Sequence, residues 1–201
     1  MTRTALILGV ALATFAVQPL EAQQASFNFF VTSQPRTDGG NLRGLNGADQ
    51  HCDFLAYARG YGDMNWRAYL SSPGDGDPVH ARDRIGSGPW YNFNGVLIAE
   101  DSDHLHGPDH NLSAETALTE RGERVPEDAR AILTGSDTEG RLFEGDSDAT
   151  CQGWSSNDSG GARVGHLGDQ NEGESWNSAH TTSGCAPEDL GGGLMYCFGG
   201  G

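Results

Sequence analysis

The stretch Asp101–Asn111, "DSDHLHGPDHN", concentrates side chains that bind metal ions and polar ligands. His104 and His106 are two residues apart, a spacing that places both imidazoles on one side of an extended chain. Together with one carboxylate they would form a transition-metal site, for example for zinc. Calcium would instead take oxygen ligands, which the stretch offers on Asp101, Asp103, Asp109 and Asn111. The competing interpretation is a solvated loop whose Asp and Asn side chains form local turns.

Catalytic signatures are absent from the rest of the chain. The sequence contains no HExxH, no G-x-S-x-G, no P-loop and no dinucleotide-binding fingerprint. The Asp101–Asn111 stretch begins like an EF-hand loop but lacks the closing glutamate. These observations favour a non-catalytic protein and leave a metal-dependent hydrolase as the least favoured alternative.

A second group of candidates lies in the C-terminal third of the chain. Trp176 is followed by Asn177 and His180 in a glycine-rich region, and Asp158 lies in the polar stretch "SSNDSGG". An aromatic ring beside amide and carboxyl groups is typical of a site for a polar ligand. We therefore predict a ligand-binding role for these four residues. The alternative is a tryptophan in the core and an aspartate in a turn.

The charge balance restricts the possible partners. The chain of 201 residues has a formal net charge of −16, and all twelve basic residues are arginines. Such an acidic surface repels nucleic acid, anionic lipid and heparin-type polyanions. It is compatible with a cation, a neutral sugar or a basic protein, and it also favours solubility.

The N-terminus predicts export. "MTRTALILGVALATFAVQPLEA" has a basic start, an apolar run and a small-residue cleavage site, so residues 1–22 resemble a secretory signal peptide rather than a membrane anchor. No later run is long enough to span a membrane, and we expect no membrane insertion. Residues 23–201 would then form one secreted, periplasmic or cell-surface domain.

Four cysteines remain after cleavage: Cys52, Cys151, Cys185 and Cys197. No two of them form a CxxC pair, which argues against a zinc ribbon or a thioredoxin-like motif. An even number in an exported chain predicts two disulfides, but spacing alone does not choose among the possible pairings.

Periodicity predicts a mixed α+β fold. We expect a helix over Gly47–Gly60, because Ala48, Cys52, Leu55 and Ala56 form one apolar stripe. Asn94-Gly95 predicts a hairpin turn, and a short helix is expected at Ala114–Glu120 within a long loop. Strands are expected at Ala25–Ser33, Asn65–Ser72, Ala131–Thr134, Cys151–Ser155, Ala162–His166, Trp176–Ala179 and Leu194–Phe198.

Several segments, in order along the chain, resemble the C-type-lectin-like fold. They are a cysteine on the first helix, "NWRAYLSS", "ARDRIGSGPWYNFNGVLI", "GSDTEGRLFEGDSDATCQGW" and the final "GLMYC". The chain most resembles the endostatin branch, the C-terminal domain of certain collagens, and its bacterial secreted relatives. This resemblance spans Gly47–Cys197. It implies nested disulfides, Cys52–Cys197 and Cys151–Cys185.

The chain also departs from these relatives. It lacks the N-terminal histidines that carry endostatin's zinc, and its arginines are too scattered for heparin. "SWNSAH" has Ser178 where calcium-dependent lectins have an aspartate. Our leading hypothesis is a secreted, non-catalytic module that binds a glycan or an extracellular protein through loops, with calcium as the possible cofactor ahead of zinc. A structural or adhesive envelope protein is the alternative.

Overall fold

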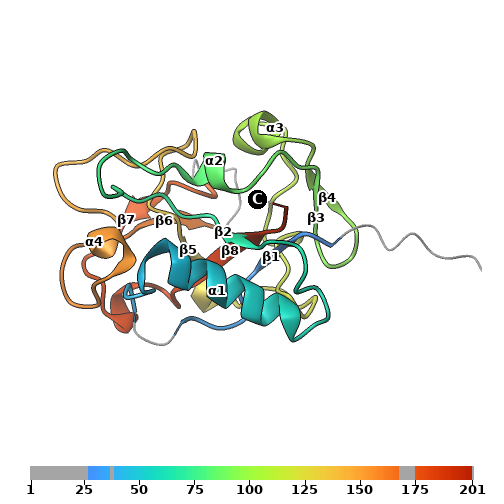
Figure 1. The fold of residues 1–201 in the computed structure, drawn as a ribbon, viewed down its shortest axis with the longest axis horizontal. Helices are drawn as coiled ribbons and strands as arrows, with labels where there is room; N and C mark the ends of the chain where they lie inside the picture. The colour runs from blue at the N-terminus through green and yellow to red at the C-terminus, as the bar shows by residue number, and fades with distance from the viewer. Residues whose placement is uncertain (1–26, 37–38, 168–174, 201) are drawn as a thin grey trace, which may run out of the picture.

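Short strands arranged around β8 (Leu194–Phe198) form the central sheet of the molecule (Figure 1). The computed structural model describes residues 27–36, 39–167 and 175–200, so the signal peptide expected at residues 1–22 lies outside the described part. The sheet order is β1-β8-β5-β6-β7, and β2 also pairs with β8. The other strands are β1 (Phe29–Val31), β2 (Arg67–Ala68), β5 (Ala131–Leu133), β6 (Arg163–His166) and β7 (His180–Thr181).

Only β5 runs parallel to β8; the other pairings of the sheet are antiparallel. A separate hairpin of β3 (Trp90–Tyr91) and β4 (Leu97–Ala99) turns at the predicted Asn94-Gly95. Few helices, short strands and two disulfides define a mixed α+β fold. The helical segments are α1 (Gly44–Tyr57), α2 (Ala81–Arg84), α3 (Ser102–His106), α4 (Cys151–Trp154), and the 3₁₀ turns η1 (Glu127–Ala129) and η3 (Pro187–Asp189).

Both faces of the sheet are covered by apolar side chains. On β8, Met195 and Cys197 join the cluster that contains the α1 residues, whereas Tyr196 and Phe198 join the cluster under α2, α3 and the hairpin. The alternation along β8 therefore divides the core into two layers. The predicted stripe of α1 is confirmed, since Ala48, Cys52, Leu55 and Ala56 are all buried. Among the described residues, no helix is long and apolar enough to cross a membrane.

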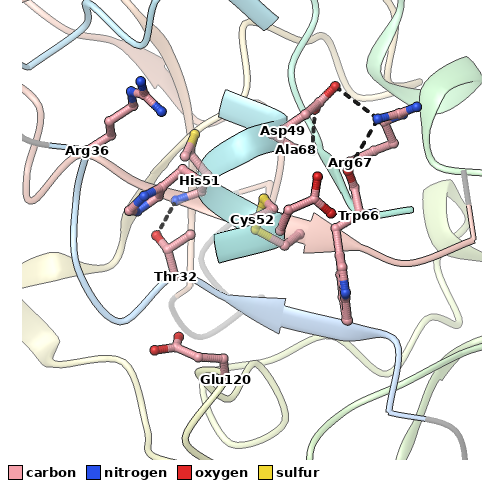
Figure 2. Close-up of a disulfide and its surroundings, with 12 residues drawn as sticks. Thr32, Arg36, Asp49, His51, Cys52, Trp66, Arg67, Ala68 and Glu120 are labelled. Atoms are coloured by element: carbon pink, nitrogen blue, oxygen red, sulfur yellow. Dashed lines mark hydrogen bonds and ion pairs between the residues drawn. A yellow bond between two sulfur atoms is a disulfide. The ribbon is translucent and has the colours of Figure 1, made fainter. Parts of the chain in front are cut away.

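Two disulfides have the nested pairing that the resemblance implied. Cys52 on α1 is bonded to Cys197 on β8, and Cys151 is bonded to Cys185. Figure 2 shows the first of these beneath α1, close to Trp66 and Asp49. The outer disulfide joins residues 145 positions apart in the chain. Its loop closure restricts the unfolded chain and fixes the buried face of α1 against the sheet.

Three predicted elements are wrong, each for a local reason. Cys151–Ser155 is a tight turn with positive φ at Cys151, Gln152 and Trp154, because Thr150 and Asp148 accept its backbone N–H groups. Trp176–Ala179 is not a strand, since the Ser175 hydroxyl accepts the N–H groups that a ladder would use. Ala114–Glu120 contains a turn instead of a helix because the Thr116 hydroxyl binds backbone groups around it.

Candidate functional site

The Asp101–Asn111 stretch begins with helix α3 instead of an extended chain. Asp101 caps this helix, because its side chain accepts the N–H of His104 at 2.8 Å. The two histidines therefore do not share one side as they would in a strand, and that premise of the zinc prediction is wrong. Within the described ranges, no group of three or more His, Cys, Asp or Glu residues is placed to hold a metal ion.

Each ring nitrogen of the two histidines already has a protein partner. In His104, Nδ1 accepts the Glu100 N–H at 3.2 Å, and Nε2 donates to the Asp109 carbonyl at 3.0 Å. In His106, Nδ1 donates to the Ser102 carbonyl at 2.6 Å, and Nε2 accepts the Tyr69 hydroxyl at 2.7 Å. A metal ion would have to break these bonds before it could bind.

The oxygen side chains of the stretch also have structural partners. Asp103 forms an exposed ion pair with Arg82 at 2.8 Å, and the Asn111 amide donates to the Leu97 carbonyl at 3.0 Å. Asp109 contributes its backbone carbonyl to His104. Together with the Asp101 cap, these contacts join the stretch to hairpin strand β4 through Leu97 and to α2 through Arg82, so its polar side chains have structural partners.

A buried polar network joins α3 to the sheet. The Asn177 amide nitrogen donates to the Tyr69 hydroxyl at 3.0 Å and to the Asp137 carbonyl at 3.0 Å, and the Asn177 oxygen accepts from Ser175. Burial raises the pKa of Tyr69 far above its usual value, while burial lowers the pKa of His106. Tyr69 is therefore a neutral donor to a neutral imidazole.

Trp176 and Asn177 lie in the interior. Trp176 is 4% exposed and packs on Tyr69 and Tyr196 at centroid distances of 4.9 and 5.3 Å. The backbone at Trp176 passes so close to Gly165 that a Cβ there would lie 1.6 Å from the Trp176 carbonyl oxygen. Neither side chain is accessible to an external ligand, because this packing encloses both.

Asp158 and His180 are exposed, as a ligand site requires, but they belong to separate segments. Asp158 accepts the hydroxyls of Ser156 and Ser159 at 3.1 and 3.2 Å, which makes it the centre of a local turn. His180 begins β7 at the edge of the sheet. Their predicted ligand-binding role stays a prediction.

The outer face of α1 carries exposed aromatic side chains. Phe54 and Tyr57 are 62% and 77% exposed, and among the described residues only Val96 is another exposed large apolar side chain. The two aromatic residues are three positions apart and therefore lie on one face of the helix. A Cβ on Gly62 would lie 2.7 Å from the Tyr57 ring, so one side of that ring rests on the Gly62 backbone while the ring stays open to solvent.

A hollow of about 590 Å³ opens beside these rings. Its polar lining comes from α1 and from the turn that follows the helix: Gln50, Asp53, Asp63 and Asn65. Asp53 is held in place because its carboxylate accepts the Trp66 N–H at 3.2 Å. We call this hollow, with Phe54 and Tyr57, the aromatic hollow.

A second hollow of about 390 Å³ continues along α1. It shares Gln50 and Phe54 with the aromatic hollow, so the two hollows adjoin each other along the helix. The other polar lining residues of the second hollow are Gln34, Arg36, Asn41, Arg43 and His51. We call it the arginine hollow, and we call the two hollows together the α1 groove.

The sequence analysis did not identify this groove, although one signal was available. Phe54 and Tyr57 lie outside the apolar stripe of α1, and an aromatic residue on the polar side of an amphipathic helix predicts an exposed ring. The rest of the lining comes from loops that periodicity does not place. No protein-family model matches the chain, and no curated protein sequence matches it. The functional conclusion therefore depends on this geometry.

Proposed function

We propose that the protein is an exported, non-catalytic binding module of the C-type-lectin-like class, and that it binds a glycan on the outer face of α1. The exposed pair Phe54 and Tyr57 beside a polar hollow is the observation that carries the proposal. The nested disulfides support the lectin-like class, and two disulfides support an oxidising compartment outside the cytoplasm.

The groove has the two kinds of group that sugars need. The C–H face of a pyranose ring is apolar and packs on an aromatic ring, and Tyr57 offers such a ring with one side next to the Gly62 backbone. Sugar hydroxyls both donate and accept hydrogen bonds, which suits the carboxylates of Asp53 and Asp63 and the amides of Gln50 and Asn65. A few polar groups around an aromatic surface are typical of a small-ligand site.

The same groove fits a protein ligand less well. A protein-binding surface of standard size buries about 800 Å² on each partner and has a centre that is more apolar than its rim and poor in charged residues. Here the exposed apolar surface is limited to two rings, and carboxylates and amides surround them.

The proposal departs from the sequence prediction in the location of the site. The rings and Asp53 belong to a helix, and the predicted loop residues Trp176 and Asn177 are enclosed. A helix held by a disulfide is more rigid than a loop, and rigidity lowers the entropic cost of binding.

A glycan array with four forms of the protein tests the proposal. We expect the wild type to bind a defined set of glycans, and Tyr57→Ala and Phe54→Ala to weaken that binding by about ten-fold or more, since truncating an aromatic anchor of a binding surface costs about 2 kcal/mol. Val96→Ala is the matched control, because it removes an exposed apolar side chain from the hairpin turn.

Two results would contradict the proposal. Binding of the same glycans by Tyr57→Ala and Phe54→Ala with wild-type affinity would refute the α1 site. The second result is that the folded wild type binds no glycan on the array, and also none of these glycans when they are added free in solution at millimolar concentration. That result would refute glycan binding and favour the adhesive alternative.

A further inference from the structure

The two hollows of the α1 groove have opposite charges. Asp53 and Asp63 line the aromatic hollow, whereas Arg36 and Arg43 line the arginine hollow together with neutral side chains. No carboxylate is among the described residues that line the arginine hollow, and within the described ranges neither arginine forms an ion pair. A positive hollow in a chain of net charge −16 is an exception to its overall electrostatics.

The positive charge is held in a defined place. The Arg36 guanidinium donates to the Gly47 carbonyl at 2.6 Å, which fixes it against the first part of α1. Arg43 precedes the helix with a φ of 61° and is exposed. Figure 2 shows Arg36 and His51 near α1, and His51 Nε2 donates to the Gln34 carbonyl at 3.0 Å.

His51 adds a neutral donor or acceptor to these cations. Burial lowers the pKa of His51 and the nearby Arg36 acts in the same direction, whereas the bond to the Gln34 carbonyl and the charge of Glu120 act against them. The imidazole is therefore neutral near pH 7 and does not add to the charge of the hollow. The two guanidinium groups remain as the charged groups to which an anion can bind.

We propose that the α1 groove selects a glycan in which a carboxylate-bearing sugar binds at Arg36 and Arg43 while a neighbouring neutral sugar stacks on Phe54 and Tyr57. This inference rests on the proposed function, and it adds the chemical class of the ligand. The shared residues Gln50 and Phe54 place the two subsites next to each other, as adjacent sugars of one chain require.

The charges of the two hollows favour alternating acidic and neutral sugars. A guanidinium pairs with a planar carboxylate through two parallel hydrogen bonds. A second carboxylate in the aromatic hollow would face Asp53 and Asp63 and be repelled. A densely sulfated chain would meet the same repulsion along the whole acidic surface, so we assign the anion to a carboxylate.

Isothermal titration with matched oligosaccharides tests this inference. The acidic probe alternates glucuronate and glucose, and the neutral probe is the same oligosaccharide after carboxyl reduction, which converts every glucuronate to glucose. We expect the wild type to bind the acidic probe about ten-fold more tightly, the size of one charge-assisted hydrogen bond. This preference falls as ionic strength rises, because salt screens the charges.

Variants locate the preference. Arg43→Gln lowers the affinity for the acidic probe more than the affinity for the neutral probe, so that most of the preference is lost. Arg36→Gln has the same effect, with a melting curve to confirm folding because Arg36 also holds Gly47. Arg59→Gln is the matched control, since Arg59 is an exposed arginine that lines neither hollow. Tyr57→Ala weakens both probes.

Two further probes distinguish the alternatives. An oligosaccharide of glucuronate alone and a sulfated cello-oligosaccharide are both expected to bind more weakly than the alternating probe. Equal affinity of the wild type for the acidic and neutral probes, or an undiminished preference in Arg43→Gln and Arg36→Gln, would overturn the inference while the proposed function stands. Tightest binding of the sulfated probe would overturn the assignment to a carboxylate. If Tyr57→Ala binds both probes as tightly as the wild type does, the proposed site itself is refuted.

Discussion

Asp49 connects α1 to the strand and helix that follow it, and its replacement should destabilise the protein strongly. Its carboxylate accepts the Ala68 N–H at 2.9 Å and receives the Arg84 guanidinium at 2.8 Å on both oxygens. The side chains of Asp49 and Arg84 are 12% and 11% exposed. Figure 2 shows Asp49 beside Ala68 and Arg67, next to the Cys52 disulfide. Asp49→Ala therefore leaves a buried cation and a buried N–H group without this acceptor.

The magnitude follows from these two losses. Breaking a buried ion pair by removing one partner costs about 3–5 kcal/mol. The orphaned Ala68 N–H accounts for about 1–3 kcal/mol of that loss. Asp49→Asn keeps an oxygen acceptor for the Ala68 N–H and should recover about that part. Arg84→Met removes the cation but leaves the carboxylate with Ala68 and with Arg67 at 3.5 Å.

The assay is urea denaturation followed by tryptophan fluorescence, with the disulfides intact, for the wild type, Asp49→Ala, Arg84→Met and the double variant. The double variant carries neither charge. Its loss of unfolding free energy should therefore be smaller than the sum of the two single losses by about 1.5–3 kcal/mol. Additive losses would refute the coupling. A loss below about 1 kcal/mol in Asp49→Ala would refute the claim that Asp49 holds α1 to β2.

Two further predictions concern the histidines. Burial lowers the pKa of His51, His106 and His110 below the ordinary value of 6.5, so the unfolded chain binds protons more readily than the folded one. Their contribution to stability is fully present above pH 6.5 and is lost as the pH falls through that value toward the lowered pKa values. In urea denaturation, the free energy of unfolding should fall less between about pH 7 and pH 5 in His106→Gln than in the wild type. Equal falls in the two proteins would contradict the role of His106. His106→Ala should lower the free energy of unfolding by about 1–3 kcal/mol, because it leaves the buried Tyr69 hydroxyl without its acceptor. His104→Ala, the neighbouring control, should cost clearly less because the bonds of that ring are exposed, and equal losses would show that the Tyr69 contact contributes little.

The parts of the fold that the sequence predicts are those with a regular apolar pattern. The stripe of α1 follows from helical periodicity, β8 from its short apolar run, and the hairpin at Asn94-Gly95 from its turn chemistry. Helix α3 has only five residues and depends on the Asp101 cap, so no periodicity marks it. The left-handed turn at Cys151 depends on the backbone N–H groups of Gln152 and Gly153, which donate to the Asp148 and Thr150 side chains, together with a disulfide to a distant residue.

The candidate site divides in the same way. Phe54 and Tyr57 could be recognised as exposed, because they lie off the stripe that the sequence predicts for α1. Gly62, Asp63 and Arg36 reach the groove through turns whose course depends on tertiary contacts such as the Arg36 bond to Gly47. Trp176 and Asn177 have the chemistry of a ligand site, but the close approach of their backbone to Gly165 places them inside.

The position of the groove gives the outer disulfide a role beyond stability. The buried side of α1 is fixed to β8 by Cys52–Cys197 and to β2 by Asp49, so the helix backbone that carries Phe54 and Tyr57 is held in place before any ligand binds. Binding then orders few additional groups, and more of the contact energy is retained as affinity. An acidic, glycine-rich chain with short strands has few other rigid elements on which to build a site. This is the physical reason why we place the proposed site on the helix and not on the loops.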